Sequence, residues 1–186
     1  MSSGIYGALS GAVTVDNHLE VLSNNLANVS TPGFKQERSF FQSILDNRVQ
    51  TGAGLGVNYS AMDGTETDFS QGRIEYTGRN LDLAIEGDGF FKVADENGFY
   101  YTRHGGFQRM PDGAVVTRSG EQLVGENGPI VIPDHTVRIE QDGTILGSNG
   151  QQVGQVDIYR IENNQALQKQ GNSLWSFEDA GEEEIA

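Results

Sequence analysis

The chain contains no cysteine, which excludes disulfide frameworks, thiolate metal sites and thiol nucleophiles. Basic residues are also scarce, because Lys and Arg number 12 against 26 Asp and Glu, giving a formal net charge of -14. Proteins that neutralise phosphates need clustered Lys and Arg, so this balance argues against nucleic acid as a partner. The same charge disfavours binding to anionic membranes.

No uninterrupted apolar run approaches the length of a membrane span, so we expect no membrane insertion. The first basic residue is Lys35, so the N-terminus lacks both the positive and the apolar region of a secretory signal. We therefore expect synthesis in the cytoplasm, with any export following a route that cleaves no signal peptide.

Motifs for catalysis, metal binding and cofactor binding are missing as well. His18, His104 and His135 lie far apart, and neither HExxH nor GxSxG occurs. The glycines of residues 51–56, TGAGLG, do not have the spacing of a phosphate-binding loop. Acidic turns such as that at Asp142 do not continue into a calcium loop. The sequence predicts no catalytic residue, no metal and no cofactor, and a protein that is not an enzyme.

An apolar heptad seam occupies the first 30 residues. Its members follow one another at intervals of 3, 4, 3, 4, 3, 4 and 3, the spacing of a coiled-coil strand: Ile5, Ala8, Ala12, Val15, Leu19, Leu22, Leu26 and Val29. We expect a helix of about 25 residues, roughly 38 Å long, capped by Ser2 or Ser3 and ended by Thr31 before Pro32. The alternative is a surface helix lying on a globular core.

Neutral amides collect on a different flank of this helix. Asn24, Asn25 and Asn28 lie there with Asn17, where Glu and Lys would normally favour a solvated helix face. Amides both donate and accept hydrogen bonds, and their burial costs less than that of charges. The pattern favours a helix with two contact faces, and the alternative is a polar flank near a fraying end.

The remainder of the chain reads mainly as β structure. Phe40, Phe41, Ile44 and Leu45 could form a short helix between Gln36 and Asn58, and residues 51–56 read as a loop. Beyond Asp68, turn dipeptides Asn-Gly or Asp-Gly at residues 97, 112, 127 and 142 recur every 15 residues, and another follows at 149. Strand-like runs lie between them. We predict an antiparallel, Greek-key or barrel-like β domain plus a long coiled-coil-forming helix.

Four regions follow from this pattern. Residues 1–34 form the assembly helix, 35–78 an extended linker, 79–175 the β domain and 176–186 an acidic tail with the composition of a disordered segment. The chain offers no second heptad stretch to pair with the seam. We expect the mate to come from another molecule, or the sequence to be a fragment.

Two long motifs resemble the signatures of the bacterial flagellar rod, hook and hook-associated proteins. The stretch SNNLANVSTPGFK is similar to the N-terminal signature of that family, and DFSQGRIEYTGRNLDLAIEGDGFFKV to its second signature. YTRHGGFQRMPDGAVVTRSGEQLVG resembles the segment that follows in rod proteins. The chain looks most like a proximal-rod or distal-rod subunit, and we favour the proximal type.

The resemblance implies a structural subunit exported by the flagellar type III apparatus and stacked helically in the periplasmic rod, with its terminal helices toward the channel. Its partners would be copies of itself, neighbouring rod and hook proteins and the export apparatus. The seam would form the coiled coil, while Asn24, Asn25, Asn28, Pro32, Gly33 and Phe34 would contact other subunits. Five apolar residues would anchor the β domain: Leu81, Leu83, Ile85, Phe90 and Phe91.

An alternative from another class is a secreted β-domain adhesin or carbohydrate-binding module with an N-terminal oligomerisation helix. Exposed aromatic side chains on one β face would support it, and Tyr100, Tyr101 and Trp175 are the candidates.

Overall fold

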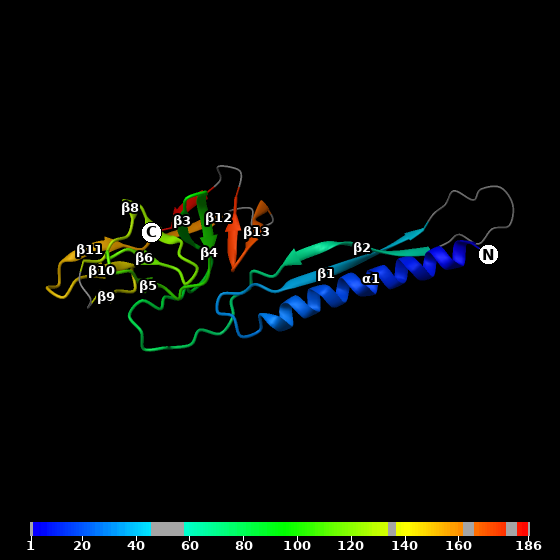
Figure 1. The fold of residues 1–186 in the computed structure, drawn as a ribbon, viewed down its shortest axis with the longest axis horizontal. Helices are drawn as coiled ribbons and strands as arrows, with labels where there is room; N and C mark the ends of the chain where they lie inside the picture. The colour runs from blue at the N-terminus through cyan, green and yellow to red at the C-terminus, as the bar shows by residue number, and fades with distance from the viewer. Residues whose placement is uncertain (1, 46–57, 134–136, 162–165, 178–181, 186) are drawn as a thin grey trace. The chain divides into compact units, whose positions relative to one another are not determined.

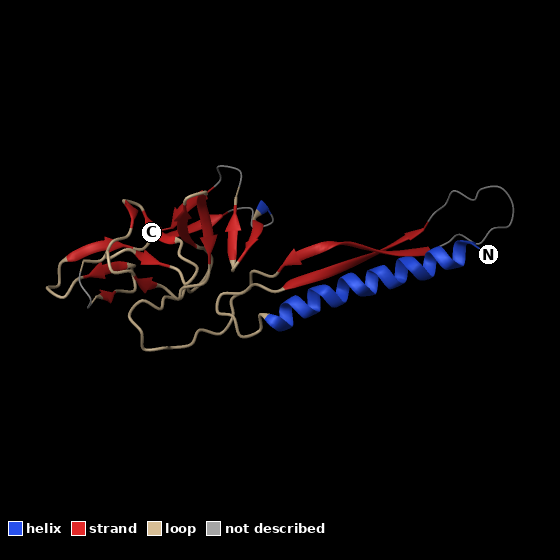
Figure 2. Ribbon diagram, viewed as in Figure 1, coloured by secondary structure: helices blue, strands red, loops and turns tan. Residues whose placement is uncertain are grey.

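The computed structural model describes residues 2–45, 58–133, 137–161, 166–177 and 182–185. It contains two compact units, which we call the helix–hairpin unit (residues 1–30 and 35–69) and the β unit (residues 31–34 and 70–186). Strands predominate, with one long helix at the N-terminus, as Figure 2 shows. The predicted fold class is confirmed, whereas the four-region division stays a prediction.

Helix α1 spans Ser2–Ala27 and then closes with a turn. Asn28 N donates to Asn24 O at 3.2 Å, and Val29 N donates to Leu26 O at 3.3 Å, the shorter-range bond that tightens a last turn. The helix therefore ends earlier than the predicted Thr31, and Val29, the last member of the seam, lies outside it. Asn and Ser side chains compete with helical hydrogen bonds, which accounts for the early end.

A long antiparallel hairpin follows. Strand β1 (Glu37–Leu45) pairs with β2 (Asn58–Thr67), with a register shift between Phe40 and Phe41. The prediction of a short helix at Phe40, Phe41, Ile44 and Leu45 is thus wrong for the described residues. Aromatic and β-branched residues favour strands, and a short apolar run cannot be told from a helix by its period alone. The predicted loop at residues 51–56 lies outside the described residues.

The open end of this hairpin is fastened by polar contacts. Asp68 N donates to Gln36 O at 2.9 Å, and the Asp68 carboxylate lies 2.7 Å from the Arg38 guanidinium. The buried Lys35 donates through Nζ to Phe69 O at 3.1 Å. These contacts fix where the two strands enter and leave the helix–hairpin unit.

The β unit contains a large sheet, a three-stranded sheet and a two-stranded sheet, and every strand pair in them is antiparallel. The large sheet has the order β13-β14-β4-β3-β7-β6-β5, with β8 pairing to β7. Its strands are β3 (Phe91–Asp95), β4 (Gly98–Thr102), β5 (Gln108–Arg109), β6 (Val115–Val116), β7 (Gln122–Gly125), β8 (Gly128–Pro129), β13 (Gln168–Gly171) and β14 (Leu174–Ser176). The smaller sheets contain β9 (Arg138–Ile139), β10 (Thr144–Leu146), β11 (Gln152–Gln155), β12 (Ile158–Ile161) and β15 (Glu182–Ile185).

The predicted turn dipeptides fall between these strands. Their glycines all have positive φ: Gly98, Gly113, Gly128, Gly143 and Gly150. At Gly143, where φ is 82°, a Cβ would also lie 2.2 Å from Val156 O, so no other residue fits without a shift of the main chain. The turns are confirmed as the sequence predicted them.

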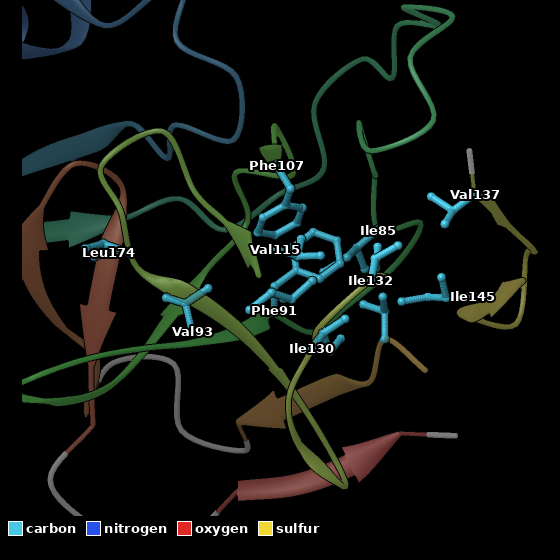
Figure 3. Close-up of a cluster of buried hydrophobic side chains, with 12 residues drawn as sticks. Ile85, Phe91, Val93, Phe107, Val115, Ile130, Ile132, Val137, Ile145 and Leu174 are labelled. Atoms are coloured by element: carbon cyan, nitrogen blue, oxygen red, sulfur yellow. The ribbon is translucent and has the colours of Figure 1, made fainter. Parts of the chain in front are cut away.

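One apolar cluster fills the β unit, and Figure 3 shows most of its side chains. Phe91 and Phe107 meet edge to face with ring centroids 5.3 Å apart, a geometry that adds to the energy of burial. Ile85 belongs to the same cluster, Phe90 is buried, and Leu81 and Leu83 pack against it partly buried. These residues anchor the β unit as predicted.

The acidic tail departs from the sequence prediction. Residues Glu182–Ile185 form β15, which pairs antiparallel with β12 and places Glu183 opposite Arg160 in the register. Disorder is therefore a wrong prediction for these residues, because β12 offers a strand edge that a local reading of charge cannot detect. Residues 178–181 lie outside the described residues.

Candidate assembly surface

One face of α1 is covered by the β1–β2 hairpin, which lies along the helix in Figure 1. Thr14 and Val21 are buried there. The half-buried residues at the same helical spacing are small or polar: Gly7, Ser10, Gly11, Asn17, His18, Asn25 and Asn28. The hairpin thus packs on the polar flank of the helix and leaves the apolar one uncovered, the reverse of an ordinary amphipathic surface helix.

Side chains with defined partners hold this polar flank. His18 Nδ1 lies 2.6 Å from Ser39 Oγ on β1, and the His18 ring meets Phe41 edge to face at 5.3 Å. The Thr14 hydroxyl donates to Ser10 O at 2.8 Å within the helix. The polar groups of the covered flank are therefore bonded, as burial requires.

Asn25 makes the most specific contact between helix and hairpin. Its Nδ2 donates to Glu37 O at 2.8 Å, and its Oδ1 accepts from Glu37 N at 3.0 Å. The neighbouring amides behave differently: Asn28 Nδ2 donates to Asn24 O at 2.9 Å, and the Asn24 side chain is exposed. The two-faced helix is thus present, with the hairpin on its amide flank, and the role of these amides in contacts with other subunits stays a prediction.

The apolar seam lies on the uncovered side of the helix. All its predicted members are exposed, and the large ones range from 48% for Leu22 to 76% for Val29. Leu9 and Val13 are exposed as well and widen this surface. Their four-residue steps from Ile5 carried that signal, which a strict heptad reading missed. A contiguous apolar surface of this kind marks an interaction site, and its pairing into a coiled coil stays a prediction.

The predicted exit segment after the helix is seated on the β unit. Gly33 has a φ of 71°, and a Cβ there would lie 2.7 Å from main-chain atoms of Arg103 and His104. The Phe34 ring lies under Lys169 Nζ at 5.0 Å, and Pro32 is exposed. Gly33 is therefore required by both its conformation and its close contact, while its predicted contact with other subunits remains untested.

The described residues contain no group of three or more His, Asp or Glu arranged to hold a metal ion. Within the same part of the chain, no helix is both long and apolar enough to cross a membrane. Burial lowers the pKa of the half-buried His104, and Arg118 lowers it further against an opposing effect of Asp82. His135 lies outside the described residues.

Comparison with known proteins places these features in a family. Residues 5–35 match the family described as flagella basal body rod protein, and residues 84–147 match the flagellar hook protein FlgE/F/G D1 domain. The flagellar basal-body rod protein FlgG of Bacillus subtilis (strain 168) is 33% identical, over 94% of this chain and 73% of its own length. The chain belongs to the flagellar basal-body rod protein family. This confirms the resemblance carried by the two signatures.

Rod proteins of two kinds resemble this family member equally well. The rod protein FlgF of Caulobacter vibrioides is 32% identical, over 94% of this chain and 73% of its own length. The FlgF of Salmonella typhimurium is 31% identical, over 94% of this chain and 71% of its own length. These near-equal values favour neither FlgG nor FlgF, so the preference for a proximal-rod type stays a prediction.

The β unit offers little support for the alternative of an adhesin or carbohydrate-binding module. Tyr101 and Trp175 are buried and Tyr100 is half-buried, so these aromatic side chains do not form the exposed platform that the alternative requires. Trp175 lies on β14, which inserts beside β4 and pairs it with Tyr101.

Proposed function

We propose that this rod-family protein is a structural subunit that assembles with copies of itself and with neighbouring rod and hook proteins through the exposed apolar face of α1. The observation that carries the proposal is the orientation of the helix: its polar flank is covered and its apolar seam is open. In this proposal the protein has no catalytic role, leaves the cytoplasm through the flagellar type III apparatus without a cleaved signal, and acts in the periplasmic rod.

The size of the exposed surface supports assembly through α1. Fully burying a Leu or Ile side chain contributes about 1.5–3 kcal/mol, so covering the exposed half of Leu22 contributes about 1 kcal/mol. Leu26 is 74% exposed and Ile5 69%, so each contributes somewhat more. Several such residues along one helix favour a helical mate, and a heterologous contact of this kind generates an open helical assembly.

The polar residues beside the seam fit secondary contacts. Asn24 is exposed next to the covered amides, and Pro32 is exposed where the chain leaves the helix. We therefore extend the proposal to Asn24, Asn25, Asn28 and the segment 32–34, with Asn24 and Pro32 lying nearest to other subunits. Neutral amides suit this position because they can be buried with partners at a lower cost than charges.

The proposal is tested by complementing a deletion strain and analysing purified hook-basal bodies by peptide mass spectrometry. The wild-type protein is expected in them, and Leu22→Asp is expected to be absent because assembly would bury an unpaired carboxylate. Ser23→Asp adds the same charge at an exposed position off the seam and should be incorporated. Since Leu22 is already exposed, Leu22→Asp should change thermal unfolding by less than about 0.5 kcal/mol.

Val21→Asp provides the opposite control, because Val21 is buried against the hairpin and its replacement should unfold the helix–hairpin unit. Normal incorporation of Leu22→Asp would contradict assembly through the seam. Absence of the wild-type protein from well-recovered basal bodies would contradict the rod assignment itself and favour the secreted binding module.

A further inference from the structure

A short exposed segment of the β unit presents apolar side chains to solvent. Residues 72–77 read GRIEYT and are all exposed, with Ile74 at 50% and Tyr76 at 99%. No hydrogen bond joins the backbone of residues 72–76 to the rest of the described chain. Because side chains alternate along an extended backbone, Ile74 and Tyr76 can face one way while Glu75 faces the other.

A groove of about 700 Å³ lies immediately after this segment in the sequence. Leu81, Phe107 and Val137 contribute apolar surface to its lining, and Phe107 and Val137 also belong to the core cluster in Figure 3. Met110 lines it as well and is 43% exposed. The groove therefore offers an apolar surface that a ring from outside could cover.

Two arginines add positive charge to the groove lining. Arg109 donates to the carbonyl oxygens of Ile132 at 2.8 Å and Pro133 at 2.9 Å, and it makes no ion pair with another described residue. Arg79, the other, lies 3.3 Å from the Asp82 carboxylate. In a chain with a net charge of -14, such a groove is a favourable place for an acidic segment of another copy.

We propose that residues 72–77 of one copy dock into this groove of the next copy, with Tyr76 and Ile74 against its apolar lining and Glu75 toward Arg109. The inference rests on the proposed function, since it supplies a second contact between assembling subunits. The segment and the groove are different surfaces of each copy, so the contact is heterologous and extends into an open chain.

The size of the contact sets its strength. A tyrosine side chain buries 150–250 Å², at the upper end about a quarter of the ~800 Å² that each partner buries in a stable interface. The docked segment therefore adds to assembly through α1 and does not hold two copies together alone. Covalent trapping is the appropriate measurement for a contact of this strength.

The absence of cysteine makes trapping direct. Full-length Tyr76→Cys and Met110→Cys proteins are mixed with a short bis-maleimide, and the rate of heterodimer formation is compared with that of Phe99→Cys plus Met110→Cys. Phe99 is a matched exposed aromatic residue of the same unit, 59% exposed. We expect the pair at 76 and 110 to link at least about tenfold faster, with the rate falling as salt rises.

Two further variants make the outcome decisive. The double variant Tyr76→Cys with Met110→Cys should give a ladder of covalent multimers. Glu75→Arg should slow the linking, and Arg109→Glu in the receiving copy should restore it. Equal rates for the control pair, a closed dimer, or a link within one copy would each overturn the proposal. If wild-type protein is present in basal bodies and Leu22→Asp is absent, such a result removes the docking contact and leaves the rod assignment standing.

Discussion

Replacing Asn25 tests whether the amide flank of α1 exists to hold the hairpin. Asn25→Ala removes the pair of hydrogen bonds to Glu37, at 2.8 and 3.0 Å. A hydrogen bond contributes a net of about 0.5–1.5 kcal/mol, so the pair should contribute about 1–3 kcal/mol. Alanine is the better helix former by up to about 0.7 kcal/mol, which offsets part of the loss. We expect the helix–hairpin unit to be destabilised by about 0.5–2.5 kcal/mol.

Asn24→Ala is the matched control. Asn24 is the adjacent residue of the same type in the same helix, its side chain is exposed, and the backbone oxygen that accepts from Asn28 survives the change. This variant should therefore show only the gain in helix propensity. The difference between the two variants, about 1–3 kcal/mol, isolates the hydrogen bonds to Glu37.

The assay is urea unfolding followed by helical circular dichroism, combined with hydrogen exchange at the Glu37 amide. Asn25→Ala should lower the unfolding midpoint and speed exchange at Glu37, whereas Asn24→Ala should do neither. Asn25→Asp retains an acceptor for Glu37 N but places a carboxylate against Glu37 O, so it should be at least as destabilising as alanine. Equal midpoints for the two alanine variants, with unchanged exchange at Glu37, would refute the reasoning.

The other predictions concern the β unit. Gly33→Ala forces a left-handed residue, which costs about 1–2 kcal/mol, and also meets main-chain atoms at 2.7 Å, so it should lower the melting temperature more than Gly120→Ala, where φ is 109° and the site is open. Burial lowers the pKa of His104 below 6.5, so the unfolded state binds the proton more readily; stability should fall as pH drops below about 6.5, and His104→Gln should flatten this dependence in thermal unfolding. The Asn97 backbone N–H lowers the pKa of Asp95 below 3.8, so its contribution is present above that value and is lost as pH falls through the folded pKa, which NMR titration of the carboxylate can verify.

Features set by local sequence were predictable. The seam spacing from Ile5 to Leu26 indicated the helix, because an apolar period near 3.6 has few other structural readings. The Asn-Gly and Asp-Gly dipeptides indicated the turns, because few other residues adopt positive φ without strain. The covered amide flank was also foreseen, since Asn is a poor choice for a solvated helix face.

Features that depend on distant partners were not predictable. Phe40 and Phe41 form part of a strand only because β2 supplies the hydrogen bonds along β1. Trp175 is buried because β14 inserts beside β4, a pairing between segments far apart in the chain. The identity of the neighbour on the amide flank, Glu37 at the start of β1, likewise comes from tertiary structure and has no signature in the sequence around Asn25.

The hairpin on the polar flank has a consequence for the kinetics of growth. Helix nucleation is unfavourable, and fixing the backbone of one residue costs about 1–2 kcal/mol. In this protein α1 is ordered against its own hairpin, so that entropy loss belongs to the folding of the monomer. For a subunit that assembles through α1, the association step then requires little further ordering, which lowers the critical concentration for elongation. A tip built from such subunits can add each newcomer as a preformed part, at a rate set by its arrival.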